Sequence, residues 1–186
     1  MAMPVRERLI TAEEFERMPE EPGVRMELVR GRVVRMSPGG VRHFRVIARL
    51  TKLFLDYEEQ SGLATVLLTT GVKLSESPDT VLEPDLALVR RDRFREVGEI
   101  PGFYPGPPEL VVEVLSPTDR PGATRQKIAR YFECGVRGIW VVDPAVASVT
   151  VYTAGAAPRT IAREGIVDAH DLFPGLHCDL RSIFLK

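Results

Sequence analysis

The sequence predicts a single domain of the α/β (α+β) class, spanning residues 1–186, with a mixed β-sheet flanked by helices. Residues 110–115 and 139–142 are short aliphatic runs, typical of strands that are covered on both faces. Residues 123–133 lie between them and have the spacing of a helix. A strand, a helix and a second strand in this order form a crossover in which the two strands run parallel. The length of 186 residues fits about one domain.

The first third of the chain is expected to contain a short helix, a β-hairpin and a long helix. The residues Thr11-Ala12-Glu13-Glu14 match the capping box that opens a helix. Residues 24–29 and 32–36 are predicted strands, joined by a turn at Arg30-Gly31. Apolar side chains then recur at helical spacing between residues 41 and 60, which predicts a long amphipathic helix.

The middle of the chain is expected to add strands and one long loop. Residues 63–68 and 71–74 have strand composition. Pro84 cannot donate a backbone hydrogen bond inside a sheet, so Asp85 is expected to open the strand that follows it. Residues 90–108 contain several prolines and glycines and are predicted to form a loop, which at this length is usually functional or mobile.

The last part of the chain is expected to finish the sheet and to cover it. Residues 149–152 and 160–162 are predicted to pair antiparallel at the far edge of the sheet. Residues 172–176 and 180–185 are apolar and are expected to pack on one sheet face.

The charge balance excludes a sequence-wide polycation. The chain has 25 Lys and Arg residues against 26 Asp and Glu residues, which gives a net charge of -1. A local basic surface stays open, because the cations are abundant and merely balanced. Most of these cations are arginines, and the lysines are Lys52, Lys73, Lys127 and Lys186.

The cysteines and the hydropathy pattern point to the cytoplasm. Cys134 and Cys178 form neither a disulfide framework nor a zinc pattern, which suits a reducing compartment. The sequence has no apolar run near the roughly 18 residues of a membrane span and no signal-peptide segment at its start. We therefore expect a cytoplasmic protein with no membrane partner.

Glu113 is a charged residue in an otherwise aliphatic strand. Strand alternation places it on the same face as Val111 and near the carboxyl end of the strand, where open α/β sheets bind ligands. An unpaired buried carboxylate is costly or stays protonated, so a cation, a metal ion or a strong donor should lie beside it. A structural glutamate paired with an arginine is the alternative, and the residues themselves leave both open.

Asp85 and Lys127 are the other candidates for chemistry. If the strand opened by Asp85 pairs antiparallel with the Glu113 strand, the two carboxylates lie side by side and repel, and Mg²⁺ would resolve the repulsion. Lys127 lies on the next helix, with Tyr131 one turn further on the same face. A lysine there can orient water or stabilise charge on a phosphate, although an exposed helix lysine is the simpler interpretation.

Glu27 and His43 also have simple structural interpretations. Glu27 fits an outward-facing position on an alternating strand. His43, together with Arg42, Arg45 and Arg49, gives the long helix a basic flank, which is either a solvated face or a phosphate contact.

Several motifs, taken in order, make the sequence similar to a known family. They are Glu27-Leu28-Val29-x-Gly31, Ser37-Pro38, His43, Glu83-Pro84-Asp85, Glu113-Val114-Leu115-Ser116-Pro117, Lys127-x-x-x-Tyr131 and Trp140-Val141-Val142-Asp143-Pro144. Each motif alone is weak, but the ordered set resembles the Uma-type restriction endonuclease family, which is placed in the PD-(D/E)XK nuclease superfamily. The resemblance runs from about residue 10 to residue 155.

The resemblance implies a restriction-endonuclease-like fold and a metal site. Asp85 and Glu113 would hold Mg²⁺ (or Mn²⁺), and Glu27 would be an accessory carboxylate near the metal. Tyr131 and His43 are candidates for auxiliary roles in the same site.

One position departs from the superfamily pattern. A lysine is expected two residues after the metal-binding glutamate, where this sequence has Leu115. Related branches supply the lysine from the next helix, and Lys127 matches that position. Lys73 is the only other strand lysine that would substitute.

We therefore predict a Mg²⁺-dependent endonuclease that acts on nucleic acid, with DNA as the expected substrate and Asp85, Glu113 and Lys127 as the catalytic residues. The alternative is a non-catalytic module that keeps the fold and binds nucleic acid or a protein. The sequence has no Walker A loop, HExxH pair or nucleophile elbow, so those enzyme classes lack their motifs. The choice between DNA and RNA stays open, as does assembly into a homo-oligomer such as a dimer.

Overall fold

The structure, a computed structural model, describes residues 8–184. The two ends of the predicted 1–186 domain, including the last residue of the 180–185 segment, lie outside the described residues. The helices in the described part are α1 (Ala12–Glu16), α2 (Val41–Ser61), α3 (Arg91–Val97), α4 (Pro121–Glu133) and α5 (Leu180–Ile183). The strands there are β1 (Arg25–Val29), β2 (Arg32–Met36), β3 (Ala64–Leu68), β4 (Val72–Ser75), β5 (Thr80–Leu82), β6 (Leu86–Arg90), β7 (Tyr104–Pro105), β8 (Leu110–Val114), β9 (Gly138–Asp143), β10 (Ser148–Thr153), β11 (Arg159–Ala162), β12 (Ile166–Asp168) and β13 (His177–Asp179).

The predicted α/β (α+β) class and mixed pairing are confirmed, but the strands form two main sheets instead of one. The first has the order β2-β1-β5-β4-β7 and the second has the order β11-β10-β9-β8-β6-β3, while β12 and β13 form a separate pair. In the second sheet, β8 pairs parallel with β9 and antiparallel with β6. The chain leaves the first sheet after Leu82 and enters the second at Leu86. Pro84 lies at this crossing, where its missing N–H costs no sheet hydrogen bond.

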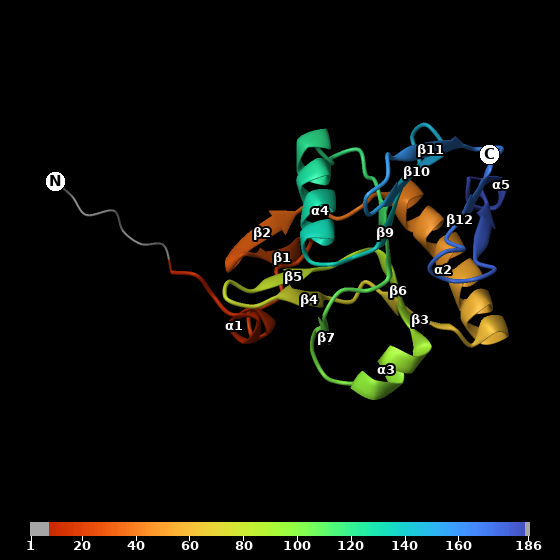
Figure 1. The fold of residues 1–186 in the computed structure, drawn as a ribbon. Coiled ribbons are helices and arrows are strands. Elements are labelled where there is room, and N and C mark those ends of the chain that lie inside the picture. Colours follow the sequence, from red (N-terminus) through yellow and green to blue (C-terminus); the bar gives the residue numbers. More distant parts are fainter. Residues whose placement is uncertain (1–7, 185–186) are drawn as a thin grey trace.

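The second sheet is covered on both faces, as the aliphatic strands predict. On β8, Leu110, Val112 and Val114 pack into a core formed with α2 and the C-terminal segment around α5. Val111, on the opposite face, packs into a second core formed with α4 and the first sheet. Figure 1 shows this layering, with α2 and the C-terminal segment on one side of β8 and β9 and α4 on the other. Glu113 shares the Val111 face and therefore points toward α4 and the first sheet.

The helices follow their sequence signals closely. Thr11 caps α1, its side chain accepts a hydrogen bond from the Glu14 N–H, and the Glu14 side chain accepts from the Thr11 N–H, which completes the predicted capping box. The predicted apolar stripe of α2 is buried at Val46, Leu50 and Phe54. Among the described residues, no helix has both the length and the apolar character needed to cross a membrane.

The prediction of a loop at residues 90–108 is wrong in part, because these residues contain α3 and β7. Phe94 of α3 stacks on Tyr104 of β7, with the two ring centroids 6.2 Å apart. Arg93 also donates a hydrogen bond to the Pro105 carbonyl at 3.2 Å. These contacts join residues about ten positions apart, so local composition does not reveal them.

Candidate active site

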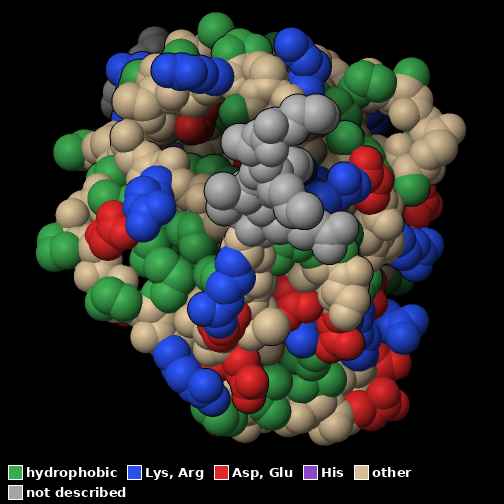
Figure 2. Space-filling view, turned by 90° about the vertical axis from the view of Figure 1, so that its left-hand side faces the viewer, with side chains coloured by type: hydrophobic (Ala, Val, Ile, Leu, Met, Phe, Trp, Pro, Cys, Tyr) green, Lys and Arg blue, Asp and Glu red, His purple; other side chains and the backbone are tan. Residues whose placement is uncertain are grey.

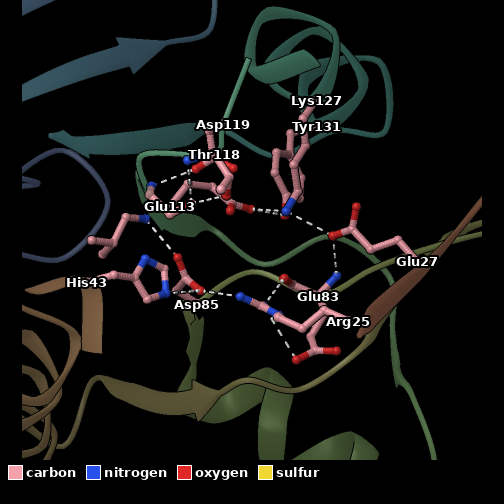
Figure 3. A network of polar contacts seen from close by, with 12 residues as sticks. Arg25, Glu27, His43, Glu83, Asp85, Glu113, Thr118, Asp119, Lys127 and Tyr131 are labelled. Atoms are coloured by element: carbon pink, nitrogen blue, oxygen red, sulfur yellow. Dashed lines mark hydrogen bonds and ion pairs between the residues drawn. The ribbon is translucent and has the colours of Figure 1, made fainter. Parts of the chain in front are cut away.

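The crossing between the two sheets opens a cavity of about 550 Å³ beside the start of α2 and the inner face of α4. It is lined by all of the predicted site residues, which are Glu27, His43, Asp85, Glu113, Lys127 and Tyr131. Figure 3 shows these side chains converging from four elements, with Glu27 on β1, His43 on α2, Glu113 on β8, and Lys127 and Tyr131 on α4. Asp85 joins them from the segment between β5 and β6.

Asp85 lies at the end of the antiparallel β6–β8 pair, as predicted. Leu86 pairs with Val112, which places Asp85 opposite Glu113. Its side chain is 2% exposed, and Oδ2 accepts a hydrogen bond from the Val114 N–H at 2.8 Å. Burial raises the pKa of Asp85, but His43, the Arg25 guanidinium and the Val114 N–H lower it more, so the net pKa lies below its ordinary value. Asp85 is therefore ionised at neutral pH.

Glu113 has the opposite electrostatic balance. Its Oε1 accepts hydrogen bonds from the Tyr131 hydroxyl at 2.6 Å and from Lys127 Nζ at 2.8 Å. Burial raises the pKa of Glu113, Lys127 opposes this rise, and repulsion from Asp85 and Glu27 adds to it, which brings the pKa to about 7. Near neutral pH Glu113 can therefore hold or release a proton.

Lys127 links two carboxylates of the cavity. Its Nζ lies 2.8 Å from Glu113 Oε1 and 2.8 Å from Glu27 Oε1, and its side chain is 19% exposed. Burial lowers the pKa of Lys127, but the two carboxylates raise it more, so the ammonium stays charged. The interpretation of Lys127 as an exposed helix lysine is thus wrong.

Glu27 does not face outward, contrary to the structural interpretation of its strand. It is 3% exposed, because the polar face of β1 points into the cavity instead of into solvent. Besides its contact with Lys127, Oε1 accepts a hydrogen bond from the Glu83 N–H at 2.9 Å. Glu27 therefore holds the crossing segment against β1.

Sequence reasoning missed Arg25, which is part of the same network. Its Nη1 donates to Asp85 Oδ1 at 2.7 Å, and its Nη2 donates to the Glu83 carbonyl at 3.0 Å. A signal was present, because Arg25 lies two residues before Glu27 on β1 and therefore on the same strand face. Arg25 was missed because this face of β1 was expected to point into solvent.

His43 is buried, so the basic flank of α2 is not a simple solvated face. It is 4% exposed, and Nε2 lies 3.5 Å from Asp85 Oδ1, too far for a well-formed hydrogen bond. Among the described residues, neither ring nitrogen has a hydrogen-bond partner. Burial lowers the pKa of His43, but Asp85 raises it more, so the net pKa lies above its ordinary value.

Gly39 makes room for the His43 ring, which gives a prediction for stability. A Cβ at Gly39 would lie 2.1 Å from His43 Cδ2, and the buried ring has little space to move. Gly39→Ala is therefore expected to lower the free energy of unfolding by about 1–3 kcal/mol, measured by urea denaturation. Gly40→Ala is the matched control, because its Cβ would meet no atom within 4 Å, and its loss should stay near ~0.5 kcal/mol. Equal losses in the two variants would contradict the role of Gly39.

The structure distinguishes the three positions that were considered for the catalytic lysine. Leu115, which stands where the resemblance implies a lysine, lines the cavity with an apolar side chain. Lys73 lies on β4, pairs with Glu76 at 2.7 Å and is not among the residues that line the cavity. Lys127 is therefore the lysine that contacts the candidate carboxylates.

The donor set of the cavity suits a hard divalent cation. All candidate donors are carboxylate oxygens, the ligands that Mg²⁺ and Mn²⁺ prefer. Within residues 8–184, no group of three or more His, Cys, Asp and Glu side chains is arranged to hold a metal ion. Mg²⁺ takes as few as one or two carboxylates because it keeps several waters, so a pair of carboxylates such as Asp85 and Glu113 fits its requirements.

Comparison with known proteins gives a family and a fold. Residues 12–181 match the model of the Uma2 family, which is described as "Putative restriction endonuclease". The fold resembles that of a solved structure from Anabaena variabilis described as "a putative nuclease belonging to DUF820", with a TM-score of 0.80 and 21% sequence identity. This likeness covers 94% of the present chain and 97% of the other. No curated protein matches the sequence.

Proposed function

Because the chain belongs to the Uma2 family of restriction-endonuclease-like proteins, we propose that it is a divalent-metal-dependent endonuclease that hydrolyses phosphodiester bonds in DNA. The observation that carries the proposal is the convergence of Asp85, Glu113 and Lys127 in one cavity. Carboxylates that repel each other while a lysine stays charged beside them suit a metal ion and a phosphate better than they suit a packed core.

Each residue has a role that follows from its contacts. Asp85 stays ionised and would hold Mg²⁺ or Mn²⁺ together with Glu113, while Glu27 keeps Lys127 in place as an accessory carboxylate. A bound cation would supply a Lewis acid that withdraws charge from the phosphate and acidifies water. Lys127 keeps its proton and stabilises the negative charge that grows on the phosphate during attack. Tyr131 orients the Glu113 carboxylate through its hydroxyl.

The charge distribution supports nucleic acid binding around the cavity more than over the whole surface. On the face shown in Figure 2, Lys and Arg side chains are interspersed with Asp and Glu side chains over the described residues. The cavity itself is lined by five Lys and Arg side chains (Arg25, Arg35, Arg120, Lys127 and Arg130) and by four Asp and Glu side chains (Glu27, Asp85, Glu113 and Asp119). Phosphate contacts from such a local group position a strand without requiring a basic protein.

The metal site is tested by thermal stability. A ligand that binds only the folded state stabilises it, by about 2.7 kcal/mol when its concentration is 100 times Kd. We expect Mg²⁺ or Mn²⁺ to raise the melting temperature of the parent protein, and Asp85→Asn to lose this shift because a metal-binding charge is gone. Asp56→Asn is the control, since Asp56 pairs with Lys52 on the exposed face of α2. A shift that survives in Asp85→Asn would place the ion elsewhere.

One observation favours the alternative of a non-catalytic module that binds nucleic acid or a protein. Asp85 and Glu113 already contact cations of the chain itself, Arg25 and Lys127. A network satisfied in this way would hold the fold without a metal ion. Absence of cleavage of duplex DNA, single-stranded DNA and RNA by the parent protein with Mg²⁺ and Mn²⁺ would favour this module.

A further inference from the structure

Arg25 holds the carboxylate oxygen that a metal ion would need. Asp85 Oδ2 is taken by the Val114 N–H, which belongs to the backbone of β8 and cannot leave without opening the strand. Asp85 Oδ1 is taken by Arg25 Nη1 at 2.7 Å, and a side chain can move away from it. Metal binding and the Arg25 contact therefore compete for Oδ1.

The charges in the cavity make this competition close. The Asp85 carboxylate is buried, and a buried carboxylate is costly unless a cation lies beside it. His43 lies 3.5 Å away without a well-formed hydrogen bond, which leaves Arg25 as the side chain that bonds Asp85 directly among the described residues. A divalent cation brings more charge than a guanidinium and removes the need for it.

The Arg25 guanidinium can leave Asp85 and still remain in the same cavity. Its Nη2 is anchored at the Glu83 carbonyl at 3.0 Å and near Glu83 Oε1 at 3.4 Å, so the side chain can pivot about this contact. Its Nε is buried and, among the described residues, has no hydrogen-bond partner. A guanidinium with free donors suits a phosphate, which it can bind through two parallel hydrogen bonds.

We propose that Arg25 is a phosphate-binding residue held in reserve at Asp85, and that it is released toward the substrate phosphate when a divalent cation occupies Asp85. This inference rests on the proposed function, and it adds an order of events. Metal binding would then free the Arg25 guanidinium to bind the nucleic acid, in addition to filling the metal site. Nucleic acid would then bind more tightly with metal than without it.

The first test measures metal affinity by calorimetric titration with Mn²⁺. Arg25→Met removes the competitor while keeping side-chain length, so its Kd for Mn²⁺ should be at least about tenfold lower than that of the parent. Arg35→Met is the matched control, because Arg35 lines the same cavity but pairs with the exposed Glu21. Its Kd should equal that of the parent. A residue that only supports the fold would weaken metal binding when it is removed.

The second test measures the binding of a fluorescent single-stranded oligodeoxynucleotide with Ca²⁺ or with EDTA, with strand integrity checked on a gel. With Ca²⁺, Arg25→Met should bind the strand at least about tenfold more weakly than the parent, because the released guanidinium is missing. With EDTA the two proteins should bind alike, because Arg25 is then held at Asp85.

If Arg25→Met does not fold, Arg25→Gln takes its place, since its amide can still donate a hydrogen bond in the cavity but carries no charge to compete with the metal. A tighter Mn²⁺ Kd combined with metal-dependent loss of strand affinity supports the inference. An unchanged or weaker Mn²⁺ Kd, or equal strand loss with EDTA, overturns it while leaving the proposed function intact. A parent protein that binds no Mn²⁺ overturns the proposed function as well.

Discussion

Lys127→Ala is expected to reduce metal-dependent cleavage of supercoiled DNA by about 10²–10³-fold, which corresponds to ~3–4 kcal/mol of transition-state stabilisation. The reason is that Lys127 is the cation that touches both Glu113 and Glu27 in the cavity, and no other lysine within residues 8–184 lines it. Lys73→Ala is the control, because Lys73 contacts Glu76 outside the cavity and should leave cleavage unchanged. Initial rates with Mg²⁺ and with Mn²⁺ at saturating DNA measure the effect.

The same variant has a stability cost that the assay must take into account. Removing Lys127 leaves Glu27 and Glu113 without their shared cation, so the metal-free variant should lose about 3–5 kcal/mol of unfolding free energy. Circular dichroism at the assay temperature distinguishes a folded, inactive variant from an unfolded one. Lys127→Arg should recover stability better than activity, because a planar guanidinium keeps the charge but not the compact geometry. If Lys127→Ala cleaves DNA as fast as the parent protein and Lys73→Ala does not cleave it, the catalytic lysine is Lys73 and not Lys127.

Glu113→Gln is expected to make the metal-free protein more stable at pH 8, by up to about 3 kcal/mol. The pKa of Glu113 rises from 4.5 to about 7 on folding, chiefly through burial, with Lys127 opposing the rise and Asp85 and Glu27 adding to it. The ionised carboxylate is therefore less favourable in the folded protein than in the unfolded chain. Glutamine keeps the shape and an acceptor for Tyr131 but carries no charge, while Lys127 retains Glu27.

The pH dependence fixes the sign of this effect. Below about pH 4.5, Glu113 is protonated in both the folded and the unfolded state and does not change the free energy of unfolding. Between pH 4.5 and about pH 7 the folded state binds more protons than the unfolded state, so the free energy of unfolding falls as the pH rises. Above about pH 7 the full penalty is present. The gain from Glu113→Gln should therefore be near zero at pH 4.5 and largest at pH 8, as measured by urea denaturation in EDTA.

A loss of about 3–5 kcal/mol in Glu113→Gln at pH 8 would instead show that its ion pair with Lys127 supports the fold. Glu113 would then be the structural glutamate that the sequence left open. Asp56→Asn, on the surface of α2, is a suitable control for the cost of an amide substitution.

The sequence by itself determined the unit of β8, α4 and β9, and it placed the two main carboxylates together on the condition that their strands pair antiparallel. Local periodicity marked β8 and β9, and the segment between them marked α4. Strand alternation and an antiparallel partner left only one place for Asp85, which is opposite Glu113. Helical spacing put Lys127 and Tyr131 on one face of α4, and both reach Glu113. These results depend on residues near each other in the chain or on strand register.

The partners of these groups were decided by the tertiary structure. Whether Glu27 faced solvent or the cavity depended on where the first sheet lies against α4, a relation between residues 100 positions apart. The same packing brought Arg25 to Asp85 and buried His43 beside it. Strand alternation states which residues share a face but not what covers that face, because the cover comes from burial of apolar area over the whole chain. The charge balance at Asp85 and Glu113 is therefore a property of the fold.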